Sequence, residues 1–137
     1  MKISAKSDYA CRAILELSLH WPNKEPLSLG AISKNQGIPM KFLTQILLHL
    51  KHLGLVISVR GQQGGYLLAK APSKITLTDV LANELNKNPA NFNKANHVVE
   101  QIWLEAEQMM CQFMDQITFE NILQREKSKG KVPMYTI

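Results

Sequence analysis

The sequence has few cysteines, no long apolar run and a long stretch without acidic side chains. Its only cysteines are Cys11 and Cys111, and no CxxC pair occurs. A disulfide framework and a self-contained zinc site are therefore excluded, because both need more thiols at closer spacing. No apolar run reaches the ~18 residues of a membrane span, and the first residues lack the apolar stretch of a secretory signal. We expect an intracellular, cytoplasmic protein that does not enter a membrane.

Acidic side chains are absent between Glu25 and Asp79, although six lysines and arginines lie in that interval. Residues 1–74 carry ten basic and three acidic side chains, whereas residues 75–137 carry six and eight. A solvated surface ordinarily mixes both signs, so this asymmetry favours a polyanionic partner for the N-terminal half. Chance is the alternative on charge alone, because only 20% of the residues are charged.

Hydrophobic periodicity predicts three helices in the N-terminal half, over residues 7–20, 29–35 and 39–53. Ser28 can cap the second helix, and Gly37 suits the left-handed residue that ends it. Pro39 suits the first position of the third helix, and Gly54 ends that helix. Its apolar stripe consists of Leu43, Ile46, Leu47, Leu50 and Leu53. Its other face has no acid and carries Lys41, Thr44, Gln45, Leu48, His49 and His52.

Residues 55–59 and 66–69 predict two strands, because β-branched and apolar residues there flank a glycine-rich turn. Two short helices joined by a turn and followed by a β-hairpin indicate a winged helix-turn-helix. The expected fold class is mainly α, with a two-stranded β-hairpin wing and a long C-terminal dimerisation helix. A helix pair with a glycine turn also occurs where the helices only pack against each other, so this pattern alone does not indicate DNA binding. The hairpin and the stretch without acidic side chains strengthen that prediction.

The C-terminal half predicts extended structure at Ile75 and Leu77, a fourth helix from Thr78 to about residue 85, and a long helix from residue 98. Residues 86–97 hold five asparagines and one proline, which favour a loop. Thr118 can cap a last helix over residues 119–124. We expect one domain, formed by a winged helix-turn-helix region (1–85), the loop (86–97), a dimerisation helix with a short terminal helix (98–126) and a flexible tail (127–137).

The face of the third helix suits a DNA major groove, because it has no carboxylate and offers donors at Lys41, Thr44 and Gln45. Arg60 in the hairpin turn can reach a minor groove, where a narrow negative channel attracts a guanidinium. Gly61, Gly64 and Gly65 would let the backbone approach phosphates. The turn lacks the spacing of a nucleotide-binding loop and precedes a strand, so we do not expect nucleotide binding.

Six segments resemble the Rrf-two family of bacterial transcription regulators, over about residues 1–125. They are SAKSDYA (4–10), residues 29–37, FLTQIL (42–47), GLV (54–56), SVRG (58–61) and GGYLLA (64–69). The hairpin signature V-R-G-x-x-G-G-Y-x-L is the specific part. The resemblance implies a homodimeric winged-helix repressor or activator on a near-palindromic operator, with the long C-terminal helix as the dimer interface.

The resemblance also implies contact residues. The third helix, over residues 39–53, would contact double-stranded DNA through Met40, Lys41, Phe42, Thr44 and Gln45. The hairpin would do so through Ser58, Arg60, Gly61, Gly64 and Gly65, and phosphates would meet Ser4, Lys6 and Tyr9. For Phe42 and Tyr9 a place in the core is the alternative. We expect the dimer interface to contain Val99, Ile102, Trp103, Ala106, Met109, Met110 and Phe113, although this stripe could instead line a pocket for a small-molecule effector.

Members of this family that sense iron, nitric oxide or redox state are similar in holding an iron-sulfur cluster on three cysteines in the loop before the long helix. Residues 86–97 contain no cysteine here, and amides do not replace thiolates. We therefore expect no cofactor. An atypical iron-sulfur cluster or metal held by Asp8, His97 and a Cys111 from the other subunit stays open.

Two other function classes fit the sequence less well. A regulator-derived protein-interaction module could dock on a metabolic enzyme, since the asparagine-rich loop lacks cluster ligands. An enzyme is not expected, because the sequence shows no nucleophile with a neighbouring base, no paired carboxylates and no metal-ligand spacing.

Overall fold

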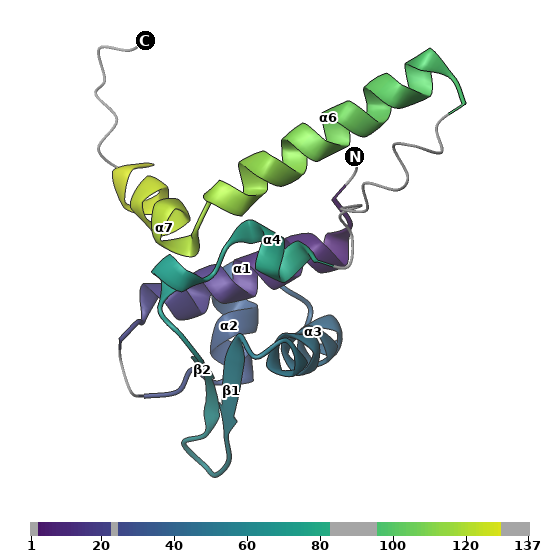
Figure 1. Ribbon diagram of the computed structural model, residues 1–137. Helices are drawn as coiled ribbons and strands as arrows, with labels where there is room; N and C mark the ends of the chain where they lie inside the picture. The colour runs from purple at the N-terminus through teal and green to yellow at the C-terminus, as the bar shows by residue number, and fades with distance from the viewer. Residues whose placement is uncertain (1–2, 23–24, 83–95, 130–137) are drawn as a thin grey trace.

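The computed structural model describes residues 3–22, 25–82 and 96–129 (Figure 1). The elements are α1 (Ala5–Leu19), α2 (Leu29–Gln36), α3 (Met40–His52), β1 (Val56–Val59), β2 (Gly65–Leu68), η1 (Pro72–Lys74), α4 (Leu77–Leu81), α6 (Val98–Gln116) and α7 (Phe119–Ser128). The expected fold class is confirmed, because helices dominate and a two-stranded antiparallel hairpin follows the helix pair α2 and α3.

The main core lies where α1, α2, α3 and the base of the hairpin meet. On α3 the predicted apolar stripe is buried at Leu43, Ile46, Leu47 and Leu50, whereas Leu53 is 37% exposed at the end of the helix. Ala13, Ile14 and Leu17 of α1 and Ile32 of α2 complete the contact. Each fully buried aliphatic side chain contributes about 1.5–3 kcal/mol, so this cluster fixes how α3 lies on α1.

The turn between α2 and α3 is held by side-chain hydrogen bonds and one left-handed glycine. Ser28 Oγ accepts the Ala31 N–H at 3.1 Å, as predicted for a cap. Gly37 ends α2 with φ of 65°, and Ser33 Oγ donates to the Ile38 carbonyl at 2.6 Å. Pro39 lies one residue before α3 rather than at its first position. These bonds fix the entry of the chain into α3.

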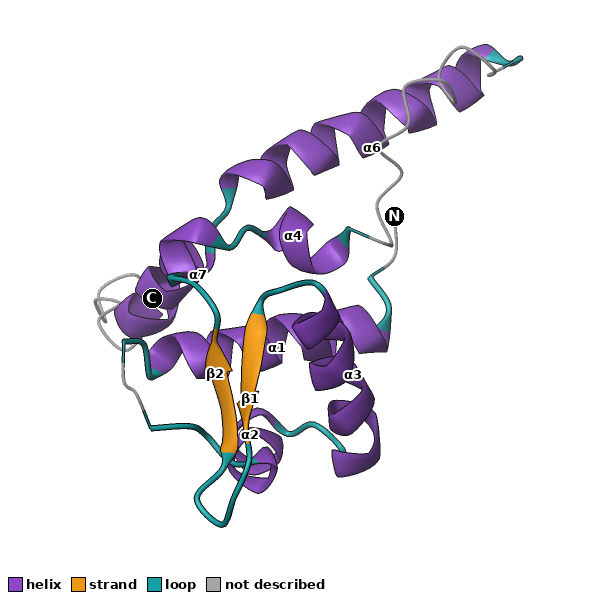
Figure 2. Cartoon of the chain, turned by 60° about the horizontal axis from the view of Figure 1, so that its bottom comes forward, coloured by secondary structure: helices purple, strands orange, loops and turns teal. Residues whose placement is uncertain are grey.

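The hairpin pairs β1 with β2 from Val56↔Leu68 to Val59↔Gly65, within one residue of the predicted strands. Its other edge is also bonded, because Leu27 and Tyr66 exchange two backbone hydrogen bonds of 3.0 and 2.8 Å. Figure 2 shows the hairpin beside α3, with its turn extending from the body. The part of β2 nearest the turn is therefore anchored to the segment that precedes α2.

The C-terminal half differs from the prediction at two helix boundaries. Leu77, predicted to be extended, begins α4, because Thr76 and Asp79 form a reciprocal capping box. The predicted end of α4 and most of the asparagine-rich loop lie outside the described residues. Thr118 caps α7 as predicted, but α7 continues to Ser128, so the first two residues of the predicted tail are helical. The fully buried Phe119 packs this helix against the main core.

Helix α6 projects away from the winged body and packs mainly on α4 (Figure 1). Cys111 of α6 is buried against Leu81 of α4, with Met114 and Cys11 beside them. Among the described helices, none is both long and apolar enough to cross a membrane.

Candidate nucleic-acid interface

The side of α3 opposite its buried stripe is wholly exposed and carries no acid. At 100° per residue this side consists of Lys41, Gln45, Leu48 and His52, which we call the outward stripe. Two of the predicted DNA contacts, Lys41 and Gln45, belong to it. Leu48 and His52 share it without having been included among the predicted contacts, although the same helical periodicity places them there.

One flank of the outward stripe borders the hairpin. Lys51 Nζ donates to Ser58 Oγ of β1 at 2.9 Å. On the same flank, Thr44 Oγ1 donates to the Met40 carbonyl at 3.2 Å, so the Thr44 oxygen keeps acceptor capacity for a ligand. Lys51 was not predicted as a site residue, because no sequence signal pairs a helix lysine with a strand serine. Its bond holds the hairpin at a fixed place beside α3.

The other flank borders the first turns of α1. The rings of Tyr9 and Phe42 stack with centroids 6.4 Å apart and planes 24° apart. Lys41 Nζ lies 5.0 Å from the centroid of the Phe42 ring. Phe42 is 45% exposed, so the alternative that it belongs to the core is wrong. Tyr9 is half-buried against the core. The aromatic pair joins the predicted phosphate contact on α1 to the predicted base contact on α3.

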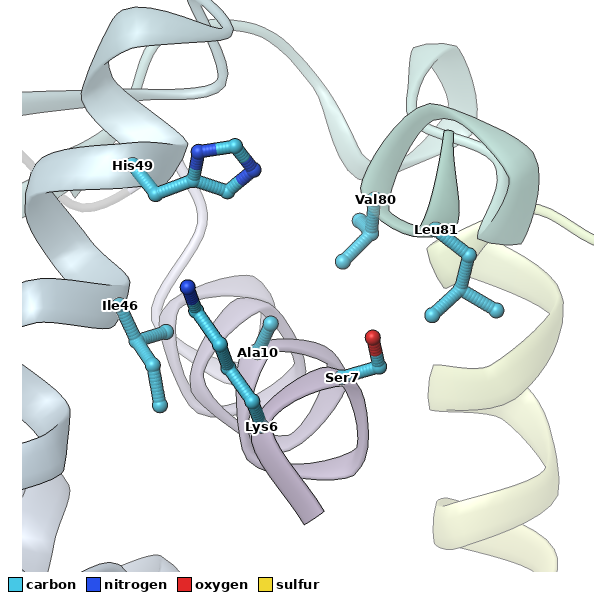
Figure 3. A pocket seen from close by; sticks show the side chains of 7 residues that line it. All are labelled: Lys6, Ser7, Ala10, Ile46, His49, Val80 and Leu81. Carbon is cyan, nitrogen blue, oxygen red and sulfur yellow. The ribbon is translucent and has the colours of Figure 1, made fainter. Parts of the chain in front are cut away.

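Two hollows follow this junction of α1 and α3. The first, which we call the aromatic groove, has a volume of about 330 Å³ and is lined by Ala5, Lys6, Tyr9, Phe42, Gln45 and Ile46. The second, of about 190 Å³, lies between α1, α3 and α4 and is lined by Lys6, Ser7, Ala10, Ile46, His49, Val80 and Leu81 (Figure 3). Lys6 and Ile46 line both hollows, so the start of α1 borders the whole flank of α3.

The start of α1 also carries the other predicted phosphate contact, Ser4. Its Oγ accepts the Ser7 N–H at 3.1 Å and caps the helix. Free backbone N–H groups and the helix dipole make such an end favourable for an anion. Asp8 in the same turn is paired with Arg12, with 2.9 Å between Oδ2 and Nε. The exposed Lys6 therefore adds positive charge to a turn whose carboxylate already has a partner.

The glycines of the hairpin turn differ in whether the fold leaves room for a side chain. Arg60 is exposed, and Gly61 beside it has φ of 117° with open space around its Cα. A Cβ on Gly64 would overlap the Val59 carbonyl oxygen, and one on Gly65 would overlap that of Leu27. The fold itself therefore requires Gly64 and Gly65, which were predicted only as places of phosphate approach.

The three residues considered for an atypical metal or cluster serve other purposes within one chain. Asp8 pairs with Arg12, and His97 Nδ1 accepts the Val99 N–H at 3.1 Å as the cap of α6. Cys111 is buried against Leu81. Over residues 3–22, 25–82 and 96–129, no three His, Cys, Asp or Glu side chains gather as a metal site. The donor set of this chain does not fit a cluster held by three thiolates.

The predicted interface residues of α6 form an uncovered apolar face in one chain. The exposed fractions are 64% for Trp103, 70% for Met109 and 56% for Phe113. Val99, Ile102 and Ala106 are also exposed, and Met110 is half-buried. This face is distinct from the side of α6 that buries Cys111 on α4. Large contiguous apolar faces on a helix ordinarily mark an interaction surface.

Solved structures with this architecture are transcription regulators. IscR of T. potens matches with a TM-score of 0.82 and 29% identity, over 99% of this chain and 96% of that chain. CymR, described as the global cysteine regulator of B. subtilis, matches with a TM-score of 0.75 and 25% identity, over 91% of this chain and 98% of that chain.

Curated relatives agree in sequence. An HTH-type transcriptional regulator of Synechocystis sp. is 43% identical over 82 residues, which are 60% of this chain and 55% of the relative. IscR of Photorhabdus laumondii is 42% identical over 81 residues, which are 59% of this chain and 49% of the relative. The chain spans about half the length of these curated relatives.

A longer alignment with IscR of Erwinia tasmaniensis gives 29% identity over 135 residues, covering 93% of this chain and 81% of the relative. The profile of the Rrf2 (Rrf-two) family, described as "Iron-dependent Transcriptional regulator", matches residues 3–125. The family consists of transcription regulators and not of enzymes. This chain therefore belongs to the Rrf2 family.

Proposed function

We propose that the protein is a sequence-specific DNA-binding transcription regulator that acts as a homodimer, and as a repressor, on a near-palindromic operator. One observation carries the proposal. The outward stripe of α3 is exposed and free of acids, lies beside a hairpin tipped by Arg60, and is bordered by the basic start of α1. Family membership agrees with this assignment.

The proposed contacts follow from these positions. Lys41, Thr44 and Gln45 read base edges in the major groove, together with Met40 and Phe42. Arg60 enters the neighbouring minor groove, where its guanidinium meets the most negative potential. Ser4, Lys6 and Tyr9 hold the phosphates that border α1, and Ser58 keeps the hairpin in place through Lys51.

The homodimer is proposed from the exposed apolar face of α6. Covering Trp103, Met109 and Phe113 removes a large apolar area from water, which is the main driving force of association. A twofold dimer places two identical recognition helices on the duplex, so its operator is near-palindromic. Repression is the proposed outcome because a dimer bound at an operator that overlaps a promoter excludes the polymerase sterically.

The test is salt-dependent DNA binding by the purified full chain. A genomic selection supplies the duplex, and fluorescence anisotropy measures its affinity between 50 and 200 mM salt. A dimer that neutralises roughly 6 to 10 phosphates loses about 10³ to 10⁵ in affinity over this range. Lys41→Ala should weaken binding, whereas Lys127→Ala on α7 serves as the control. Binding that is absent or insensitive to salt would refute the proposal.

A further inference from the structure

The aromatic groove combines an apolar lining with basic neighbours. Ala5, Tyr9, Phe42 and Ile46 supply its apolar surface, and the groove has a volume of about 330 Å³. None of its six described lining residues is acidic, and Lys6 is one of them. Lys41 lies directly beside it, over the Phe42 ring. An apolar hollow with one lysine in its wall and a second over the ring of a lining phenylalanine suits a partner that is anionic overall and has a small apolar group at its surface.

The Phe42 ring is positioned before any ligand binds. Tyr9 stacks on it at 6.4 Å and the Lys41 ammonium lies 5.0 Å from its centroid, yet 45% of the residue remains exposed. A side chain held in this way loses little rotamer freedom on binding. Covering its remaining exposed surface with another apolar group removes that surface from water, which favours binding.

The groove also meets the surface that faces the duplex in the proposed function. Gln45 lines the groove and belongs to the outward stripe of α3, so the groove opens beside the residues that read base edges. The 5-methyl group of thymine is the apolar group that a base pair presents in the major groove. A double helix thus supplies both the small apolar group and the surrounding negative charge.

From this position we infer that Phe42 is a specificity-determining residue, which selects a thymine in each operator half-site by packing against its 5-methyl group at the aromatic groove. The inference rests on the proposed function and adds the identity of one base to it. It assigns the Phe42 contact to the methyl group of one base rather than to a hydrogen-bonding group of a base edge.

The experiment compares thymine with deoxyuridine, which pairs identically but lacks the methyl group. Each thymine of the selected operator is replaced in turn, symmetrically in both half-sites, and the affinity of the full-length protein is measured. One position should lose about fourfold per half-site, as expected for roughly one buried methyl group. At that position Phe42→Ala should bind the thymine and deoxyuridine duplexes equally, so the effects of the two changes are not additive.

Two variants make the result specific. Phe42→Leu keeps an apolar side chain and should retain part of the preference for thymine. Leu19→Ala removes an exposed apolar side chain at the C-terminal end of α1, away from the proposed DNA surface, and should leave the preference at this position unchanged. The inference is overturned if the native protein binds the operator but no deoxyuridine weakens it, or if Phe42→Ala keeps the full preference. Failure to bind any operator would instead refute the proposed function, and this inference with it.

Discussion

At the scale of single residues, Gly65 shows that one glycine can serve the fold where the sequence favours a ligand. Glycines in the hairpin signature predicted close approach to phosphates, but the Leu27 carbonyl occupies the place of a Gly65 side chain. The sequence could not reveal this contact, because Leu27 is 38 positions away and its bridge to Tyr66 depends on the tertiary fold. Of Gly61, Gly64 and Gly65, only Gly61 has open space where a side chain would lie.

We therefore expect Gly65→Ala to lower the free energy of unfolding by about 1–3 kcal/mol, because a backbone segment must shift to accept the methyl group. Gly30→Ala is the matched control. Gly30 lies in α2 with no atom near its missing Cβ and no positive φ, so the same change should stabilise by roughly 0.5 kcal/mol. Urea unfolding monitored by circular dichroism measures both. Equal effects of the two substitutions would contradict this explanation.

Phe42 shows the converse at the same scale. Helical periodicity places it beside the apolar stripe of α3, so the sequence left both a buried and an exposed position open. The structure decides because Tyr9 of α1 stacks on the ring and occupies the side nearest the core. Partners from a distant helix are what a single-sequence pattern lacks.

At the scale of elements, the helix-turn-helix and the hairpin were predictable because their signals are local. Serine caps, the left-handed Gly37 and the apolar stripe of α3 all act within a few residues of their own position. The start of α4 differs from the prediction by one residue, because Thr76 and Asp79 cap the helix together and make Leu77 its first residue. The contact between α3 and the hairpin needed the structure, since Lys51 and Ser58 belong to different elements.

The hairpin carries the third prediction. Arg60→Ala should weaken specific operator binding by about 1–3 kcal/mol, because it removes the guanidinium proposed for the minor groove. Arg125→Ala, an exposed arginine on α7, is the control for loss of one positive charge. Anisotropy titrations of the selected operator measure both. If Arg60→Ala binds as tightly as the Arg125→Ala control, Arg60 does not contact the operator.

At the scale of the whole molecule, the exposed face of α6 is the proposed dimer interface. Trp103→Glu should make the protein monomeric, because it places an unpaired charge where the proposed dimer buries a large aromatic side chain. The free energy of dimerisation should weaken by about 2–4 kcal/mol. Gln101→Glu introduces the same charge at an exposed position on a different side of the helix and should remain dimeric. Light scattering after gel filtration gives the mass of each. A dimeric Trp103→Glu variant would place the interface elsewhere.

In the proposed dimer, the attachment of α6 to the winged body would set how accurately the two subunits are spaced. This helix of 19 residues is about 28 Å long and rests mainly on the five residues of α4. Because α6 is held mainly by this short helix, a small rotation at the contact displaces the far end of α6. Cys111, which packs on α4, lies 13 residues from Val98 at the far end, or about 20 Å. A tilt of roughly 10° at α4 therefore moves the far end by about 3.4 Å, the rise of one base pair. Because one inserted base pair also rotates a half-site by roughly 35° about the duplex axis, tolerance of insertions at the operator centre requires α4 to let α6 both tilt and twist.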